Sequence, residues 1–369
     1  MTVPKHKVLI LKTPARPELA DHIPEFEQFK KYFDVQIKDV TTKEDLIESF
    51  DKDYHDVSGL WITGYSIWKV GGLSTVMDHL PKNLKVVVYP WVGYMQDEAD
   101  KLKEKGIIYC NVGDVSANDV ADIALNLTLS AYRFTSYFEH QARQQLTILP
   151  ARMILGSQSF DSKTGEPEAP PDSANLSKNM SLGGKKIETP AGKIAGIVGL
   201  GSIGAAIGKR LSAIGMEIRY TKRTPLSHED QVKLGYEAKY YSTFHELIPE
   251  VDLIVFAVPH SPSTKHLINP ETIKLVKPGV RIVNIGRGSA IDEDVMFKAL
   301  DDGTINSVGL DVFEGEPSID PRYQNRWDVT ITPHIGNLTT DNNVESNKRC
   351  MENIVNVLIE NGPGISPIN

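Results

Sequence analysis

The chain has 369 residues, 40% of them hydrophobic and 24% charged, with a formal net charge of −8 at pH 7. This composition is ordinary for a globular protein with room for two domains, and it excludes a disordered or fibrous one. The negative balance argues against nucleic acid or an anionic membrane as a general partner, because binding of phosphate groups requires clustered Lys and Arg.

The cysteines and the N-terminus bear on the compartment. Cys110 and Cys350 lie far apart in the sequence and form no metal-ligand spacing, so we interpret both as apolar fillers in a reducing compartment and predict no metal site. Residues 1–7 lack the apolar core of a signal peptide, and no apolar stretch approaches the roughly 18 residues of a membrane span. The sequence therefore predicts a cytoplasmic protein without a membrane segment.

Short apolar runs alternate with helical patterns in the first part of the chain, at 8–11, 33–37, 59–63 and 85–89. Such runs are typical of a parallel sheet covered on both faces. A polar cap and early acidic residues then begin a long apolar helix at 118–127, which could bridge two domains. The stretch 159–181 is rich in Ser, Pro, Gly and acidic residues and is predicted to be a mobile surface excursion.

A second series of strand-like runs contains a glycine motif; its runs are 194–198, 217–220, 253–257, 281–285 and 307–310. The motif GxGxxG follows the first run and opens a helical pattern. Its first two glycines let the backbone turn and approach a pyrophosphate, and the third allows close helix packing. The motif therefore predicts a dinucleotide site that includes Gly199, Gly201, Ser202, Ile203 and Gly204.

The residues after the second strand of this series indicate which dinucleotide binds. Lys222 lies eighteen residues after Gly204, where an acidic residue usually binds the ribose of NAD, and Arg223 follows it. A cationic pair would attract a 2′-phosphate, whereas a carboxylate would repel it. We predict NADP over NAD, with a solvated basic turn as the alternative.

The segment 192–204 resembles the cofactor signature of the D-isomer-specific 2-hydroxyacid dehydrogenases. Three further segments resemble the family's motifs in the family's order, namely 283–288, 309–317 and 332–336. Upstream, residues 91–94 resemble the family's substrate loop and residues 116–122 resemble its interdomain helix. The resemblance covers nearly the whole chain and extends to glyoxylate/hydroxypyruvate reductase-like and D-mandelate dehydrogenase-like members.

This resemblance implies an α/β fold of two Rossmann-like, doubly wound parallel-sheet domains with a cleft between them. The substrate domain would be discontinuous, comprising 1–113 and 341–369, and 114–340 would form the dinucleotide-binding domain. Family members are usually dimers joined through the nucleotide domains, so a homodimer is expected. The family often has Asp after the Gly-Tyr of its substrate loop, but here Met95 follows Tyr94, and the region from about 146 to 190 is longer than usual. Both departures concern substrate choice.

Reduction of a 2-keto acid needs an anchor for the carboxylate, a proton donor and stabilisation of the carbonyl oxygen. Arg287 fits the anchor because its fork of donors can reach both groups. His334 fits the proton donor, and Glu316 fits the partner of its other ring nitrogen. Backbone N–H groups near Val92 and Gly93, followed by Tyr94, would complete substrate binding.

Other residues carry weaker assignments. The candidate cofactor site also includes Val258, Pro259, Ile285, Gly286, Asp311, His334 and Gly336. We interpret His260 as a loop residue outside the chemistry, and three other histidines as surface or packing residues: His228, His245 and His266. The aromatic residues Trp68, Trp91 and Tyr94 either line a substrate pocket or belong to the core.

Two classes of function follow. The first is an NADP-dependent D-2-hydroxyacid dehydrogenase that works mainly as a reductase of glyoxylate, hydroxypyruvate or a bulkier 2-keto acid. The second is a nucleotide-sensing binding protein on the same scaffold, because the C-terminal-binding corepressors resemble this family but act through partners.

Overall fold

Parallel strands alternate with helices in the computed structural model, which describes residues 5–13, 18–64, 66–161 and 164–369. The chain divides into two compact units, one formed by Met1–Ser116 with Asn337–Asn369 and the other by Ala117–Gly336. Among the described residues, no helix is both long and apolar enough to cross a membrane. The cytoplasmic location stays a prediction, and residues 1–4, on which it partly rests, lie outside the described ranges.

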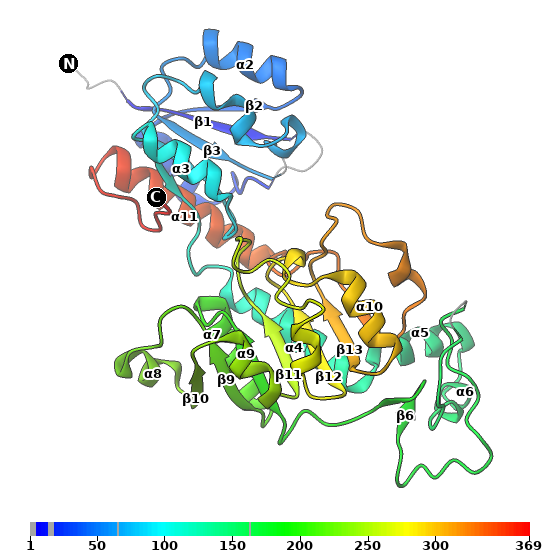
Figure 1. Cartoon of the computed structure of the whole chain (residues 1–369). Helices are drawn as coiled ribbons and strands as arrows, with labels where there is room; N and C mark the ends of the chain where they lie inside the picture. Colours follow the sequence, from blue (N-terminus) through cyan, green and yellow to red (C-terminus); the bar gives the residue numbers. More distant parts are fainter. Residues whose placement is uncertain (1–4, 14–17, 65, 162–163) are drawn as a thin grey trace. The chain divides into compact units, whose positions relative to one another are not determined.

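The first unit contains a five-stranded parallel sheet, of which Figure 1 labels β1, β2 and β3. The strand order is β2-β1-β3-β4-β5. Its strands are β1 (Lys7–Lys12), β2 (Asp34–Asp39), β3 (Gly59–Ile62), β4 (Val86–Val88) and β5 (Ile108–Cys110). Its helices are α1 (Pro24–Tyr32), α2 (Lys43–Lys52), α3 (Gln96–Glu104) and α11 (Thr340–Leu358), with short 3₁₀ turns at Trp68–Val70 and Leu73–His79.

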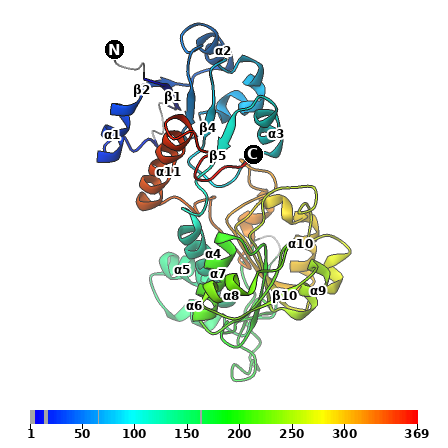
Figure 2. The same cartoon turned by 90° about the vertical axis from the view of Figure 1, so that its left-hand side faces the viewer.

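Successive residues of β1 point to opposite faces of this sheet, and each face has its own core. Leu9 and Leu11 pack with residues of α2 and α3, whereas Val8 and Ile10 pack with residues of α1 and α11. Figure 2 shows these two helix pairs on opposite sides of the strands. Because both faces are covered, the inner strands β1, β3 and β4 are continuous apolar runs in the sequence, whereas the edge strand β2 is mostly polar and at most partly buried.

The second unit contains a seven-stranded parallel sheet in the order β10-β9-β8-β11-β12-β13-β14. Its strands are β8 (Ile194–Val198), β9 (Glu217–Thr221), β10 (Ala238–Tyr241), β11 (Leu253–Phe256), β12 (Val280–Asn284), β13 (Ile305–Leu310) and β14 (Val329–Ile331). The order reverses at β8, as in the Rossmann fold, which places a ligand-binding crevice at the carboxyl ends of β8 and β11.

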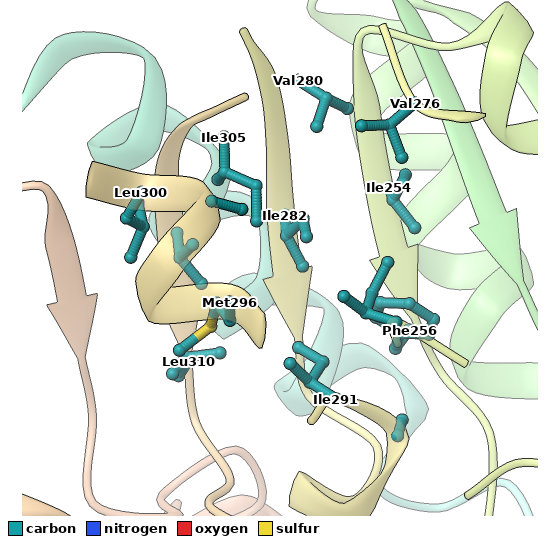
Figure 3. Close-up of a cluster of buried hydrophobic side chains, with 14 of the residues drawn as sticks. Ile254, Phe256, Val276, Val280, Ile282, Ile291, Met296, Leu300, Ile305 and Leu310 are labelled. Carbon is teal, nitrogen blue, oxygen red and sulfur yellow. The ribbon is translucent and has the colours of Figure 1, made fainter. Parts of the chain in front are cut away.

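Helices cover both faces of this sheet as well. The helices that pack on it are α4 (Ala117–Arg133), α7 (Ser202–Ala213), α9 (Phe244–Leu247) and α10 (Glu293–Asp301), and α8 (His228–Leu234) precedes the edge strand β10 with no fully buried residue. On one face Ile254 and Ile282 pack with Met296 and Leu300 of α10 (Figure 3). On the other face, α4 and α7 cover the same strands.

An extension follows α4 and contains α5 (Thr135–Gln145), α6 (Leu149–Met153) and the small hairpin of β6 (Ser181–Leu182) with β7 (Lys185–Lys186). It includes the stretch 159–181, of which residues 162 and 163 lie outside the described ranges. Glu166 ties this stretch to α5, since its carboxylate accepts a hydrogen bond of 3.0 Å from Gln141. The expected mobility of the stretch stays a prediction.

Candidate active site

The glycine motif forms the turn between β8 and α7. Gly199 has a φ of +95°, in the left-handed region that favours glycine. A Cβ on Gly204 would lie 2.2 Å from the carbonyl oxygen of Gly199, so only glycine permits the helix to start this close to the strand. Gly201 occupies the N-cap of α7 and gives the helix no side-chain cap. A cradle of this shape, open to the first N–H groups of a helix, fits a pyrophosphate.

Lys222 lies beside this turn. It follows β9, the strand next to β8, and its Nζ donates a hydrogen bond of 3.1 Å to the carbonyl oxygen of Leu200 inside the glycine motif. Arg223 is exposed. The structure therefore brings the predicted basic residue to the predicted loop.

The side chains of His334 and Glu316 are hydrogen-bonded to each other in the same unit. The His334 Nδ1 lies 2.9 Å from Glu316 Oε2, and Glu316 Oε1 accepts a hydrogen bond of 2.9 Å from the Phe313 N–H. Burial alone would raise the pKa of Glu316, but these two hydrogen bonds and the charges of His334 and Arg287 bring that pKa below its ordinary value. The ionised carboxylate only accepts hydrogen bonds, so Nδ1 must carry the proton and Nε2 remains for other contacts.

Arg287 follows β12, whose carboxyl end lies beside that of β13. The buried Asn284 fixes the turn that carries Arg287. Its side-chain amide donates a hydrogen bond of 2.9 Å to the Arg287 carbonyl oxygen and accepts one of 3.1 Å from the Gly286 N–H. Burial lowers the pKa of the guanidinium, and the charge of Glu316 opposes this. The group still stays charged near neutral pH.

Gly288 allows the Arg287 loop to approach the Glu316 loop. A Cβ at position 288 would lie 1.9 Å from the carbonyl carbon of Phe313 and 2.1 Å from its oxygen. Both atoms belong to the backbone, which cannot turn aside as a side chain does. The glycine at position 288 thus sets how close the loops of Arg287 and Glu316 can lie to each other.

Asp311 holds the loop that carries His334. It is buried at 2% exposure, and its carboxylate accepts hydrogen bonds from the Thr332 hydroxyl at 2.6 Å and from the N–H groups of Ile335 and Gly336, each at 2.9 Å. Between these anchors, His334 has a φ of +53°, which a non-glycine residue adopts only under constraint. The motif did not indicate this role, and the predicted contact of Asp311 with the cofactor stays a prediction.

The comparisons with known proteins show the family of this chain. Residues 174–336 match the NAD binding domain of the D-isomer specific 2-hydroxyacid dehydrogenases. A Saccharomyces cerevisiae protein that carries the name 2-hydroxyacid dehydrogenase is 33% identical, over 95% of this chain and 93% of its own length. The chain belongs to the D-isomer-specific 2-hydroxyacid dehydrogenase family.

Two further relatives of this dehydrogenase differ in the substrate that they are named for. Glyoxylate reductase 1 of Saccharomyces cerevisiae is 32% identical over 88% of this chain and 85% of its own length. The apo structure of D-mandelate dehydrogenase from Rhodotorula graminis has a TM-score of 0.81 and 28% identity, and covers 99% of this chain and 98% of the other. The predictions of the family, of two Rossmann-like parallel sheets and of an oxidoreductase with an NAD(P)-binding domain are therefore confirmed.

The other candidate cofactor residues of the dehydrogenase lie at the same sheet edge. Val258 and Pro259 follow β11, and Ile285 and Gly286 follow β12, the neighbouring strand. A Cβ on Gly286 would lie 2.6 Å from the Val258 carbonyl oxygen, so the two turns are in close contact. Gly336 packs against the Asp311 carboxylate. Their contact with a cofactor stays a prediction.

Sequence reasoning missed a second histidine–carboxylate pair in the dehydrogenase. His266 Nε2 lies 2.6 Å from Oε1 of Glu314, a residue two positions before Glu316. The backbone N–H of His266 donates a hydrogen bond of 2.7 Å to the Ser289 carbonyl oxygen. His260 Nδ1 lies 2.8 Å from Ser289 Oγ. These contacts tie the loop after β11 to the turns of Arg287 and Glu316. The two glutamates on either side of Gly315 were the one sequence signal for such a pair.

The candidate substrate residues lie in the first unit. Trp91 packs against its core, with its ring centroid 4.8 Å from that of Tyr89. Tyr94 and Trp68 have exposed fractions of 38% and 61%. Val92 and Gly93 lie between Trp91 and Tyr94 in the turn after β4. Trp91 thus acts at least partly as a core residue, while Tyr94 and Trp68 present apolar surface.

Proposed function

We propose that this dehydrogenase reduces a 2-keto acid to a D-2-hydroxy acid with NADPH. The pairing of His334 with an ionised Glu316, beside the turn of Arg287, is the observation that carries the proposal. The cofactor, when bound, supplies a hydride to the carbonyl carbon. The cradle at Gly199 and Gly204 fits its pyrophosphate for the steric reasons given above.

The residues of the chain supply the remaining steps. Arg287 binds the substrate carboxylate and polarises the carbonyl oxygen through its planar fork of donors. His334 gives the Nε2 proton to that oxygen as negative charge develops on it. Glu316 accepts the hydrogen bond from Nδ1, holds the ring in place and stabilises the imidazolium before transfer. The N–H groups of Val92 and Gly93 are proposed as further donors to the carboxylate.

NADP is the proposed cofactor, with NAD as the alternative. The support is the position of Lys222 at the glycine motif and the exposed Arg223 beside it. Neither residue could accept a hydrogen bond from a free ribose hydroxyl as an acidic residue does.

The proposed substrate is any 2-keto acid from glyoxylate or hydroxypyruvate to a bulkier one. Relatives named for glyoxylate and for D-mandelate support this range, since both molecules carry a carboxylate beside the reacting carbon. Arg287 would recognise that shared part.

The test is NADPH oxidation, followed at 340 nm, with a panel of 2-keto acids and the matching ketones and aldehydes without a carboxylate. Turnover confined to 2-keto acids is expected. Better turnover of the neutral carbonyl compounds would contradict the role of Arg287. Tight cofactor binding without any turnover would instead favour the nucleotide-sensing protein.

A homodimer formed through the nucleotide-binding unit is also proposed. Four large apolar side chains of the α5–α6 extension are exposed: Leu146 at 89%, Ile148 at 65%, Leu149 at 64% and Met153 at 72%. Such a concentration of exposed apolar surface is typical of an interface. Light scattering should give twice the chain mass, and serine at Leu146 and Met153 should shift the population toward monomer. A wild-type monomer at micromolar concentration would contradict the proposal.

A further inference from the structure

Asn111 contacts the loop proposed to bind the substrate carboxylate. This loop follows β4, and Asn111 follows β5, the adjacent parallel strand, so the two lie at the same edge of the sheet. The Asn111 Nδ2 donates a hydrogen bond of 2.7 Å to the Val92 carbonyl oxygen. The contact fixes the peptide between Val92 and Gly93.

The direction of this peptide decides what Gly93 can bind. In a trans peptide the C=O and the N–H point in opposite directions, and the bond between Val92 and Gly93 is not cis. Since the Val92 C=O points to Asn111, the Gly93 N–H points away from it. No described residue accepts a hydrogen bond from this N–H. The peptide thus presents a free donor.

Asn111 is itself held from several sides. Its backbone N–H donates a hydrogen bond of 3.2 Å to the Ser366 carbonyl oxygen. Its backbone carbonyl accepts hydrogen bonds from Asn353 Nδ2 at 2.9 Å and from the Ser366 hydroxyl at 2.6 Å. Its side-chain Oδ1 accepts 2.9 Å from the Gly113 N–H. Asn353 is fully buried. The backbone contacts hold the residue in place, and the Gly113 contact orients the side-chain amide so that Nδ2 faces Val92.

We propose that Asn111 is a positioning residue that directs the Gly93 N–H toward the carboxylate of the 2-keto acid. The proposal rests on the proposed function. It extends the substrate site to a residue that does not touch the substrate, and it assigns α11 and the segment around Ser366 to the support of that site. A hydrogen bond from an N–H to a carboxylate is charge-assisted, so its loss should weaken substrate binding.

The test is Asn111→Asp, which keeps an acceptor for Gly113 but places an oxygen against the Val92 carbonyl. The KM for the 2-keto acid should rise about tenfold or more, the range of a lost charge-assisted hydrogen bond. The KM for NADPH should not change. The matching 2-keto amide has no carboxylate, so its kcat/KM should change far less. Asn111→Ala removes the donor without adding charge and serves if the Asp variant does not fold.

Asn356→Asp is the matched control. Asn356 lies on α11, in the same unit as Asn111. Its amide Nδ2 donates a hydrogen bond of 2.7 Å to Glu360, and its Oδ1 accepts one of 2.8 Å from the Gly364 N–H. The same substitution there removes an amide donor of the same unit without touching the loop. Its KM for the 2-keto acid should equal that of wild type.

The outcomes separate the two proposals. A wild-type protein that reduces no 2-keto acid overturns the proposed function and the role of Asn111 with it. An active wild type with an unchanged KM in both Asn111 variants overturns the role of Asn111 alone. So does an equal loss with the 2-keto acid and the 2-keto amide, or the same loss in Asn356→Asp, because each would mark a purely structural effect.

Discussion

Alanine at Gly288 should separate the Arg287 turn from the Glu316 loop. The added Cβ would lie 1.9 Å from the Phe313 carbonyl carbon, whereas ordinary contacts begin near 3.4 Å. The two segments must therefore move apart by about 1.5 Å, a displacement of the size that costs roughly 10²-fold in rate when it misplaces catalytic groups. Forcing a methyl group into this backbone contact should also lower the free energy of unfolding by about 1–3 kcal/mol.

The matched control for this prediction is Gly315→Ala in the facing loop. Its Cβ would meet only the Ser318 carbonyl oxygen, at 3.4 Å, and neither glycine has a left-handed φ. We expect kcat/KM for a 2-keto acid to fall about 10²-fold in Gly288→Ala and to change little in Gly315→Ala, with urea unfolding measured in parallel. Wild-type kcat/KM and stability in Gly288→Ala would refute the argument that this close approach sets the site.

Three further predictions concern the charged residues. In wild type the preference for NADPH over NADH should be on the order of tenfold to a hundredfold. The double substitution Lys222→Asp with Arg223→Ser should reverse this preference. Equal wild-type Kd values for NADPH and NADH at moderate salt would show that Lys222 and Arg223 are only a solvated turn. His334→Gln should lower kcat by orders of magnitude while NADPH binding, followed by fluorescence, is retained; near-normal turnover would remove His334 from the mechanism. The pKa of Glu316 is lowered in the folded protein, so the ionised carboxylate stabilises the fold above its unfolded pKa near 4.5. This stabilisation is lost as the pH falls through the lower pKa of the folded state. Glu316→Gln should therefore lower the free energy of unfolding at pH 7 and lower it much less at pH 3. An equal difference at both pH values would contradict that linkage.

The sequence predicted the fold well where strands are buried on both faces. The runs at 8–11, 59–63 and 194–198 became β1, β3 and β8 with small changes at their ends. It missed β10, Ala238–Tyr241, because the residues of this edge strand are at most partly buried and its sequence AKYY contains no apolar run. It also missed β5, whose three residues are too short for a periodicity to stand out.

The contacts within the candidate site were less predictable than its members. Local motifs indicated Arg287, Glu316 and His334, and the 2.9 Å contact between the latter two agrees with the expected pairing. The contact of His266 with Glu314 spans 48 residues of sequence, and the anchoring of the His334 loop by Asp311 depends on where β13 and β14 end. Such contacts follow from which loops converge at the sheet edge, and no local pattern records that.

The two oxygens of Glu316 have separate partners, Phe313 N–H for one and His334 Nδ1 for the other. A carboxylate bound at a single oxygen could rotate as the imidazole loses and regains its proton, and each turnover would then include that motion. Here the Phe313 contact belongs to the backbone and persists in both protonation states. The environment of His334 is thus already arranged for the charged ring before substrate arrives, which keeps the reorganisation energy of proton transfer small.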